Sequence, residues 1–151
     1  MRKEYSAEIP QGLEYGVSVA ILRYCVYELS DEEIRKVWIE DTFSSEEPDE
    51  WYVSQHKYGF YITEIPIGQW TREGIINAII RDKYRIDEME AITNNMAAIN
   101  AVFMQTLVSD GIIAATKYLK ESINDANTAR FREMQEWRAM AKKVASEIIK
   151  E

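Results

Sequence analysis

The stretch TREGIINAIIRDKYRIDEMEAIT, residues 71–93, marks the point where the sequence changes from strand-like to helical patterning. Thr71 is a favourable helix N-cap, and a carboxylate at Glu73 suits the first turn of a helix. Apolar residues then recur at helical spacing, which predicts a first helix running to about Tyr84. The side chain of Asp87 can cap a second helix. The isoleucines that form the predicted apolar face of the first helix are Ile75, Ile76, Ile79 and Ile80.

The charge of the chain changes at the same place. Residues 1–70 contain 6 Lys and Arg against 14 Asp and Glu, whereas residues 71–151 contain 12 of each, so the net charge of −8 arises in the first region. Nucleic-acid binding by phosphate neutralisation needs clustered Lys and Arg, which this chain does not present. We therefore expect no nucleic-acid partner. The acidic excess either keeps the surface solvated or attracts a basic partner.

No apolar run approaches the roughly 20 residues of a transmembrane helix. Polar and acidic residues, Glu4–Glu8, stand where a signal peptide would need its apolar segment. We therefore expect a cytoplasmic or virion protein that does not bind membranes and is not secreted through a signal peptide.

The first region has the pattern of an antiparallel β-region with one short helix. Residues Met1–Gly12 are interpreted as a polar segment leading into the first regular element. Residues Leu13–Leu29 alternate with period two, which predicts one strand bent near Leu22–Arg23, or two shorter strands, with a helix over Val17–Tyr27 as the lesser alternative. Ser30 and Glu33 form a capping-box pattern that predicts a helix over Asp31–Thr42.

Aromatic and β-branched residues dominate Trp51–Pro66, after a polar acidic loop over residues 44–50. Trp51–Val53 and Phe60–Ile62 predict the two strands of a hairpin, because Gly59 between them can adopt a positive φ. His56 is interpreted as a surface residue near the tip of this hairpin.

Helical patterning continues to the end of the chain. The second helix has an apolar stripe with steps of three and four residues, the spacing of a helix packed lengthwise on a neighbour. Ser109–Gly111 interrupts it, a third helix follows from Ile112, and a further break is expected at Asn124–Thr128. The final helix is predicted from about Thr128 to Ile149. The stripe of the second helix is Met89, Ile92, Met96, Ile99 and Phe103.

These patterns predict an α+β fold, with a β-rich acidic region over residues 1–70 and a helical hairpin or three- to four-helix bundle over residues 71–151. Two sets of residues are candidates for contact with a partner. The apolar stripe of the final helix is either a core face or an interaction surface, since Met and aromatic residues are common in both. It comprises Met134, Trp137, Met140, Ala141, Val144 and Ile148. The candidate acidic patch comprises Glu46, Glu47, Asp49 and Glu50.

No catalytic constellation is recognisable in the sequence. The six glycines form no phosphate-binding loop, and a single histidine cannot build a zinc site. Cys25 lies in an apolar run and is interpreted as a small buried residue. The carboxylate pairs on the predicted helices lack the ExxH pattern of di-metal bundles. We therefore expect a non-enzymatic protein without cofactor, metal or catalytic residues.

Two fragments resemble a known pattern: AIIRDKYRIDEMEAITNN, residues 78–95, and RFREMQEWRAMAKKVASEI, residues 130–148. They are similar to small proteins encoded in the tail modules of phages and prophages of Bacteroides-type hosts, and they cover about a quarter of the chain. The resemblance implies a structural or assembly protein with no catalytic residues. The chain departs from the pattern over Asn94–Thr128, where the family would have a short loop. The matching residues are Arg81, Tyr84, Glu88, Ala91 and Ile92, then Phe131, Glu133, Trp137, Ala141 and Lys142.

Three functions are compatible with these observations. The leading hypothesis is a structural or assembly component with protein partners, forming a homo-oligomer. The second is an acidic regulatory or inhibitory protein that occupies a basic, nucleic-acid-binding surface of its partner. The third is a module that binds a small ligand, which would need a deep apolar pocket with convergent polar groups.

Overall fold

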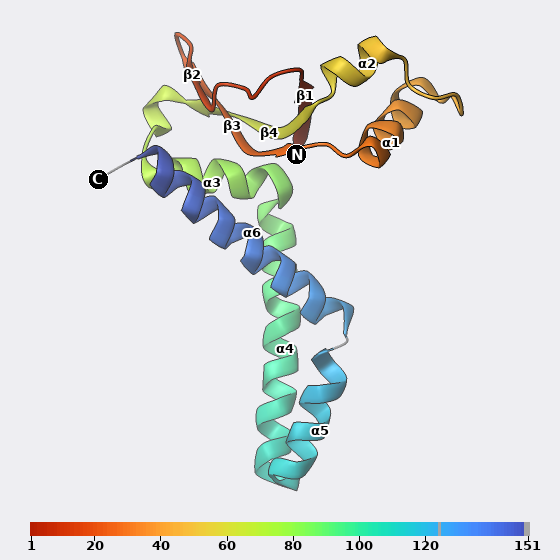
Figure 1. The fold of residues 1–151 in the computed structure, drawn as a ribbon. Coiled ribbons are helices and arrows are strands. Elements are labelled where there is room, and N and C mark those ends of the chain that lie inside the picture. Colours follow the sequence, from red (N-terminus) through yellow and green to blue (C-terminus); the bar gives the residue numbers. More distant parts are fainter. Residues whose placement is uncertain (124, 150–151) are drawn as a thin grey trace. The chain divides into compact units, whose positions relative to one another are not determined.

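A computed structural model describes residues 1–123 and 125–149, which fall into two compact units, Met1–Ala78 and Ile79–Glu151. The first unit contains an antiparallel sheet and the second is helical, so the predicted α+β class is confirmed (Figure 1). The described residues form six α-helices. Two of them, rather than the one predicted, precede residue 70, and four follow it. None of the helices in the described ranges is both long and apolar enough to cross a membrane.

The sheet has four strands in the order β1-β4-β3-β2. Its N-terminal segment is an edge strand, β1 (Arg2–Ser6), which pairs antiparallel with β4 (Tyr58–Pro66). The prediction that Met1–Gly12 only leads into the first element was therefore wrong. Pairing with β1 satisfies backbone groups of β4 that an open edge would leave exposed.

Residues 13–29 form two strands, β2 (Leu13–Tyr15) and β3 (Val19–Glu28). The turn between them is closed by the Gly16 amide, which donates to the Val19 carbonyl at 2.8 Å. A bulge interrupts β3 between Tyr24 and Tyr27, further along than predicted. Cys25 occupies this bulge with φ of 52° and is exposed, so the prediction of a buried cysteine was wrong. One extra residue shifts the ladder, so a side chain expected to face inward does not.

Helix α1 (Asp31–Thr42) has the predicted bounds and capping box: the Ser30 amide donates to Glu33 Oε2 at 2.8 Å, and the Glu33 amide donates to Ser30 Oγ at 3.3 Å. The expected strand at Trp51–Val53 is instead part of helix α2 (Glu50–Gln55), so the predicted hairpin was wrong. Only its second half forms a strand, β4.

Capping and burial explain why α2 replaces a strand. Asp49 Oδ1 accepts a hydrogen bond from the Tyr52 amide at 2.7 Å and caps the helix. The Tyr52 ring is buried in an apolar cluster with residues of α1, against Trp38. These contacts outweigh the intrinsic β-propensity of the sequence WYV, which tertiary context commonly overrides. The buried members of the cluster are Leu29, Ile34, Val37 and Tyr52.

After the short 3₁₀ turn η1 (Ile67–Gln69), helix α3 (Arg72–Lys83) starts as predicted, because Thr71 Oγ1 accepts from the Gly74 amide at 3.0 Å. Helix α4 (Ile86–Asp110) starts one residue before Asp87, which does not cap it. The capping acceptor is Glu88, whose carboxylate accepts from the Arg85 amide at 3.2 Å.

Two further helices complete the second unit: α5 (Ile112–Ile123) and α6 (Ala126–Ile148). Gly111, between α4 and α5, has φ of 87° and ψ of 178°, a conformation that is almost restricted to glycine. Of the break predicted at Asn124–Thr128, Asn124 lies outside the described residues. Asp125 is the N-cap of α6 and accepts from the Asn127 amide at 2.7 Å, so Ala126, Asn127 and Thr128 are already helical.

Candidate interaction site

The core of the second unit lies where α6 packs along the end of α3 and the first turns of α4. Tyr84, Ile92 and Met134 are buried there, with Met89, Phe131 and Trp137 packed against them. We call this part the base, defined as residues 79–93 together with α6. Its core brings together the two fragments that carry the tail-module resemblance.

A half-buried hydrogen bond and an ion pair fix α6 on the end of α3. The Trp137 indole donates through Nε1 to the Ile79 carbonyl at 2.9 Å, and Lys83 Nζ lies 2.6 Å from Glu133 Oε1. The ammonium group also lies 4.8 Å from the centre of the Trp137 ring. These contacts hold one face of α6 in a single register.

The ion pair shifts the pKa of both partners. Burial lowers the pKa of Lys83, but the hydrogen bond to Glu133 and the charges nearby outweigh it, so the pKa lies above its ordinary value of 10.5. The hydrogen bond from Lys83 lowers the pKa of Glu133 below its ordinary value of 4.5. Both shifts have a structural cause and need no catalytic role.

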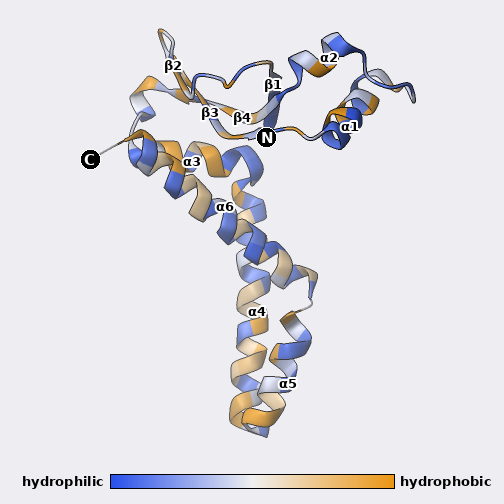
Figure 2. Ribbon diagram, viewed as in Figure 1, coloured by the Kyte–Doolittle hydropathy of each residue, from blue (hydrophilic) through white to orange (hydrophobic). Residues whose placement is uncertain are grey.

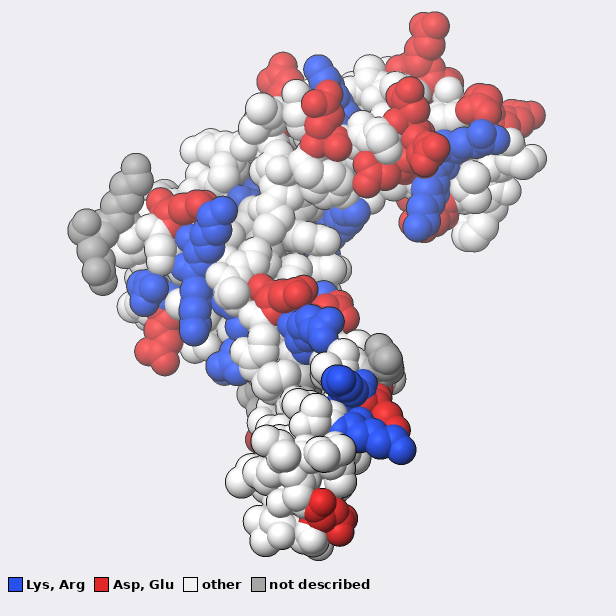
Figure 3. Space-filling view, turned by 60° about the horizontal axis from the view of Figure 1, so that its bottom comes forward, with Lys and Arg blue, Asp and Glu red and all other residues white. Residues whose placement is uncertain are grey.

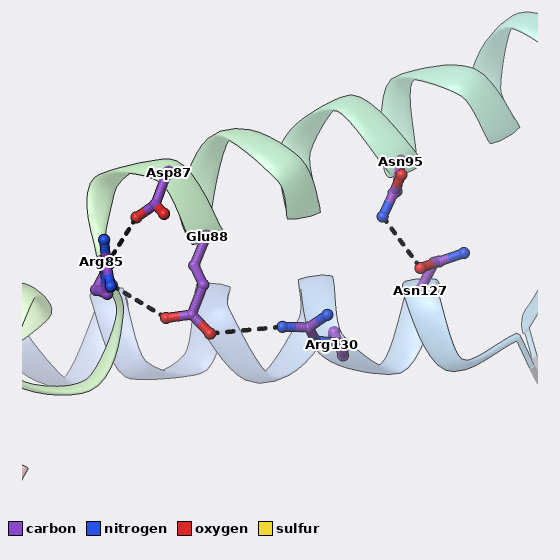
Figure 4. A network of polar contacts seen from close by, with 6 residues as sticks. All are labelled: Arg85, Asp87, Glu88, Asn95, Asn127 and Arg130. Atoms are coloured by element: carbon purple, nitrogen blue, oxygen red, sulfur yellow. Dashed lines mark hydrogen bonds and ion pairs between the residues drawn. The ribbon is translucent and has the colours of Figure 1, made fainter.

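Two more polar contacts link α6 to α4 (Figure 4). Glu88, which caps α4, also lies 3.7 Å from Arg130 of α6, and Asn95 Nδ2 donates to Asn127 Oδ1 at 3.2 Å. Arg85 and Asp87 form a further pair at the start of α4. Polar contacts therefore link α6 to α3 and α4 at Asn127, Arg130, Glu133 and Trp137.

The candidate interaction stripe of α6 is buried or half-buried throughout. Met134 and Ala141 are fully buried, and the other four members are half-buried: Trp137, Met140, Val144 and Ile148. Met134 is a core residue of the base. The stripe therefore has the burial of a packing face rather than that of an open surface.

The four residues of the candidate acidic patch are exposed and help to order the loop between α1 and α2. Asp49 caps α2, Glu47 lies 3.2 Å from Arg35, and the Glu46 carbonyl accepts from the Trp38 indole at 3.0 Å. Glu50 stands in the first turn of α2, where a carboxylate is favourable. Figure 3 shows acidic side chains gathered on this part of the first unit. Three of the four carboxylates therefore have a local structural role: Glu47, Asp49 and Glu50.

His56 ends α2 and is half-buried rather than at a hairpin tip. Its ring stacks on Tyr52 with centroids 3.8 Å apart, and Nδ1 lies 2.8 Å from the Tyr52 carbonyl. Burial, followed by a hydrogen bond to Asp41, raises the pKa of Tyr52. Within the described ranges, no group of three or more His, Cys, Asp and Glu side chains is placed to hold a metal ion.

The part of the second unit beyond the base is a helical hairpin, residues 94–123, formed by α4 and α5. We call it the α4–α5 hairpin. The predicted stripe of α4 is buried or half-buried, with Ile92 and Ile99 the most buried members, so the predicted packing face is confirmed. Across the described hairpin, α4 packs against α5.

The outer side of α4 carries a second stripe at the same spacing, which sequence reasoning missed. It consists of residues at steps of three and four that are all exposed, and we call it the outer stripe: Asn94, Ala97, Ala101, Met104 and Val108. No charged residue occurs between Glu90 and Asp110, although 29% of the chain is charged. An exposed helix face without charge over 19 residues is unusual for a solvated surface.

Large apolar side chains are exposed along the hairpin and at its end. Val108 and Ile113 are each 85% exposed, Ile112 is 71% exposed and Met104 is 56% exposed. Figure 2 shows apolar colouring along α4 and at its junction with α5, whereas α6 is mainly hydrophilic. In Figure 3 the end formed by α4 and α5 is largely free of charge. The hairpin therefore has the features of a protein-contact surface.

A shallow groove of about 560 Å³ runs along α5. Its lining comes from one helix and changes from apolar to charged: Ile112, Ile113, Thr116, Lys117, Lys120 and Glu121. Small-molecule sites enclose most of the ligand and present convergent polar groups, which a groove on a single exposed helix does not provide.

Comparison with known proteins finds no family model, no curated protein and no solved structure that matches the chain.

Proposed function

We propose that this protein is a non-enzymatic assembly component that associates with another copy of itself through the α4–α5 hairpin. The observation that carries the proposal is the exposed, uncharged hairpin face, including Met104, Val108 and Ile113. The tail-module resemblance implies the same class of function.

Exposed apolar surface on the hairpin supports association. Seven large apolar residues are exposed there, and they are spread over both of its helices. They are Val102, Met104, Val108, Ile112, Ile113, Leu119 and Ile123. Removing such a surface from water is the main driving force of association.

The distribution of charge favours a second copy as the partner. Two chains that each carry a net charge of −8 repel one another unless they meet where charge is absent. The outer stripe is uncharged, and Glu90 and Asp110 mark its limits. A lipid surface is a poorer fit, because anionic headgroups would repel an acidic protein and Asp110 stands at the end of the hairpin.

The proposal is tested by light scattering on the purified full-length protein over a range of concentrations. We expect the wild type to associate, and we expect Val108→Glu to raise the dissociation constant at least about tenfold, because it places an unpaired carboxylate on the uncharged face that makes the contact. Val17→Glu is the matched control, since Val17 is a fully exposed valine of the first unit. Its association should equal that of the wild type.

A wild type that stays monomeric at every concentration would overturn the proposal. Equal weakening by both substitutions would also count against it, because the effect would then follow from net charge alone. Flotation with phosphatidylcholine–phosphatidylglycerol vesicles, lost in Val108→Glu and unaccompanied by self-association, would identify a lipid surface as the occupant instead.

A further inference from the structure

Resting on the proposed function, we infer that two copies pack their α4 helices antiparallel along the outer stripe, with Ala101 of each copy at the two-fold axis. Isologous contacts of this kind are the commonest in homodimers. Two independent features of the stripe determine the direction: the sizes of its side chains and the position of its nearest charge.

Side-chain size along the stripe favours the antiparallel direction. Small residues occupy the first half, at Ala97, and large residues the second half, at Met104 and Val108. In an antiparallel pair centred on Ala101, Ala97 of one copy faces Met104 of the other, so the two helix axes keep an even separation. A parallel pair would place large side chains together at one end and small ones at the other, leaving a gap.

Charge favours the same direction. Glu90 is exposed and lies on the helical phase of the outer stripe, one turn before Asn94. A parallel pair would bring the two Glu90 carboxylates together, with the acidic first turn at Asp87 close behind, and like charges at contact are unfavourable. An antiparallel pair centred on Ala101 separates the two Glu90 positions by 22 residues of helix, or about 33 Å.

The axial position of Ala101 suits a close contact. Its methyl group is exposed and lets two backbones approach, while Asn94 of each copy falls opposite Val108 near the ends of the contact. The polar residue therefore lies at the rim, where interfaces are commonly polar, and the apolar residues lie at the centre.

Disulfide trapping tests the arrangement in the full chain. The background is Cys25→Ser, which removes the only native thiol and must first keep the wild-type association by light scattering. Single cysteines are then placed at Ala101, Ala97, Met104 and Val102 and oxidised with copper phenanthroline. Val102→Cys is the matched control, because it is exposed on the same turn but points about 100° away from the stripe.

We expect Ala101→Cys to form a covalent dimer readily, and Ala97→Cys mixed with Met104→Cys to form a mixed dimer. Ala97→Cys alone, Met104→Cys alone and Val102→Cys should give at most a tenth of the dimer formed by Ala101→Cys. Thermal melts of the reduced variants should match the background, since all four positions are exposed.

Efficient dimers from Ala97→Cys alone and Met104→Cys alone would establish a parallel pair and overturn the inference. Association by light scattering without trapping at Ala101 would also overturn it, while leaving the proposed function intact. If both the wild type and the Cys25→Ser background are monomeric by light scattering, the proposed function and this inference are both overturned.

Discussion

Helix α4 runs through both the base and the α4–α5 hairpin, but the residues that cover it differ between the two parts. In the base, α4 is covered by α6, and the contact combines a buried core around Met134 with hydrogen bonds and ion pairs at its edges. In the hairpin, α4 packs on α5 along one side only and exposes an uncharged stripe on the other. The base therefore contains a buried core, whereas the hairpin leaves apolar surface exposed.

Truncating a methionine on each side of this division gives the largest expected contrast. Met134→Ala removes a fully buried side chain from the base and should lower the free energy of unfolding by about 2–5 kcal/mol. Met104→Ala makes the same chemical change at an exposed site and, at a protein concentration low enough for the chain to be monomeric, should alter it by less than about 0.5 kcal/mol. Urea unfolding followed by circular dichroism measures both, and equal losses would contradict the division.

The turn of the hairpin depends on one glycine. Gly111→Ala should cost about 1–3 kcal/mol, because its backbone conformation is almost closed to other residues, while the space around it is open and no clash adds to the cost. Gly68→Ala, another site with open space and without a positive φ, is the control and should have little effect. Hydrogen exchange should locate the loss in α5 and the end of α4; a loss confined to the base would be the wrong outcome.

The carboxylate that caps α4 and pairs with Arg130 of α6 has a smaller expected effect. Glu88→Ala removes the acceptor for the Arg85 amide and the partner of Arg130, so unfolding should be easier by about 1 kcal/mol. Glu90→Ala removes an exposed carboxylate two positions later and serves as the control. Thermal melts compare them, and a stability change in Glu90→Ala as large as that in Glu88→Ala would argue against the capping role.

The smallest effect depends on pH and concerns the ion pair of the base. Because the pKa of Glu133 is lower in the folded state, its ionised form adds stability above the ordinary value of 4.5, and this is lost as pH falls through the folded-state pKa. Glu133→Gln should therefore be less stable than the wild type near neutral pH and converge with it in acid. Urea midpoints measured across this range check this, and a deficit of Glu133→Gln that persists unchanged in acid would contradict the role of the ion pair.

Local signals in the sequence predicted some elements well. The capping box at Ser30 and Glu33 gave the bounds of α1, because both hydrogen bonds form within four residues. The inward stripe of α4 was also readable, since burial on one side imposes a regular apolar spacing.

Features that depend on distant contacts were not predictable in the same way. Strand β1 forms because β4, more than fifty residues later, presents an edge to it, and helix α2 forms because Tyr52 is buried among residues of α1. The outer stripe was missed because Asn94 is polar and Ala97 and Ala101 are small, so the stripe lacks a continuous run of large apolar residues. The absence of charge from residues 91–109 was the available signal.

The contact between Asn95 and Asn127 also defines where the chain can be shortened. Two helices joined by a 3.2 Å side-chain hydrogen bond are close enough for a few glycines to connect them directly. Everything between those asparagines then becomes an exchangeable module, and the same base can carry a longer or shorter hairpin without a change in its own core. A chain lacking this module should fold and remain monomeric. The hairpin would then be needed for association but not for folding of the base.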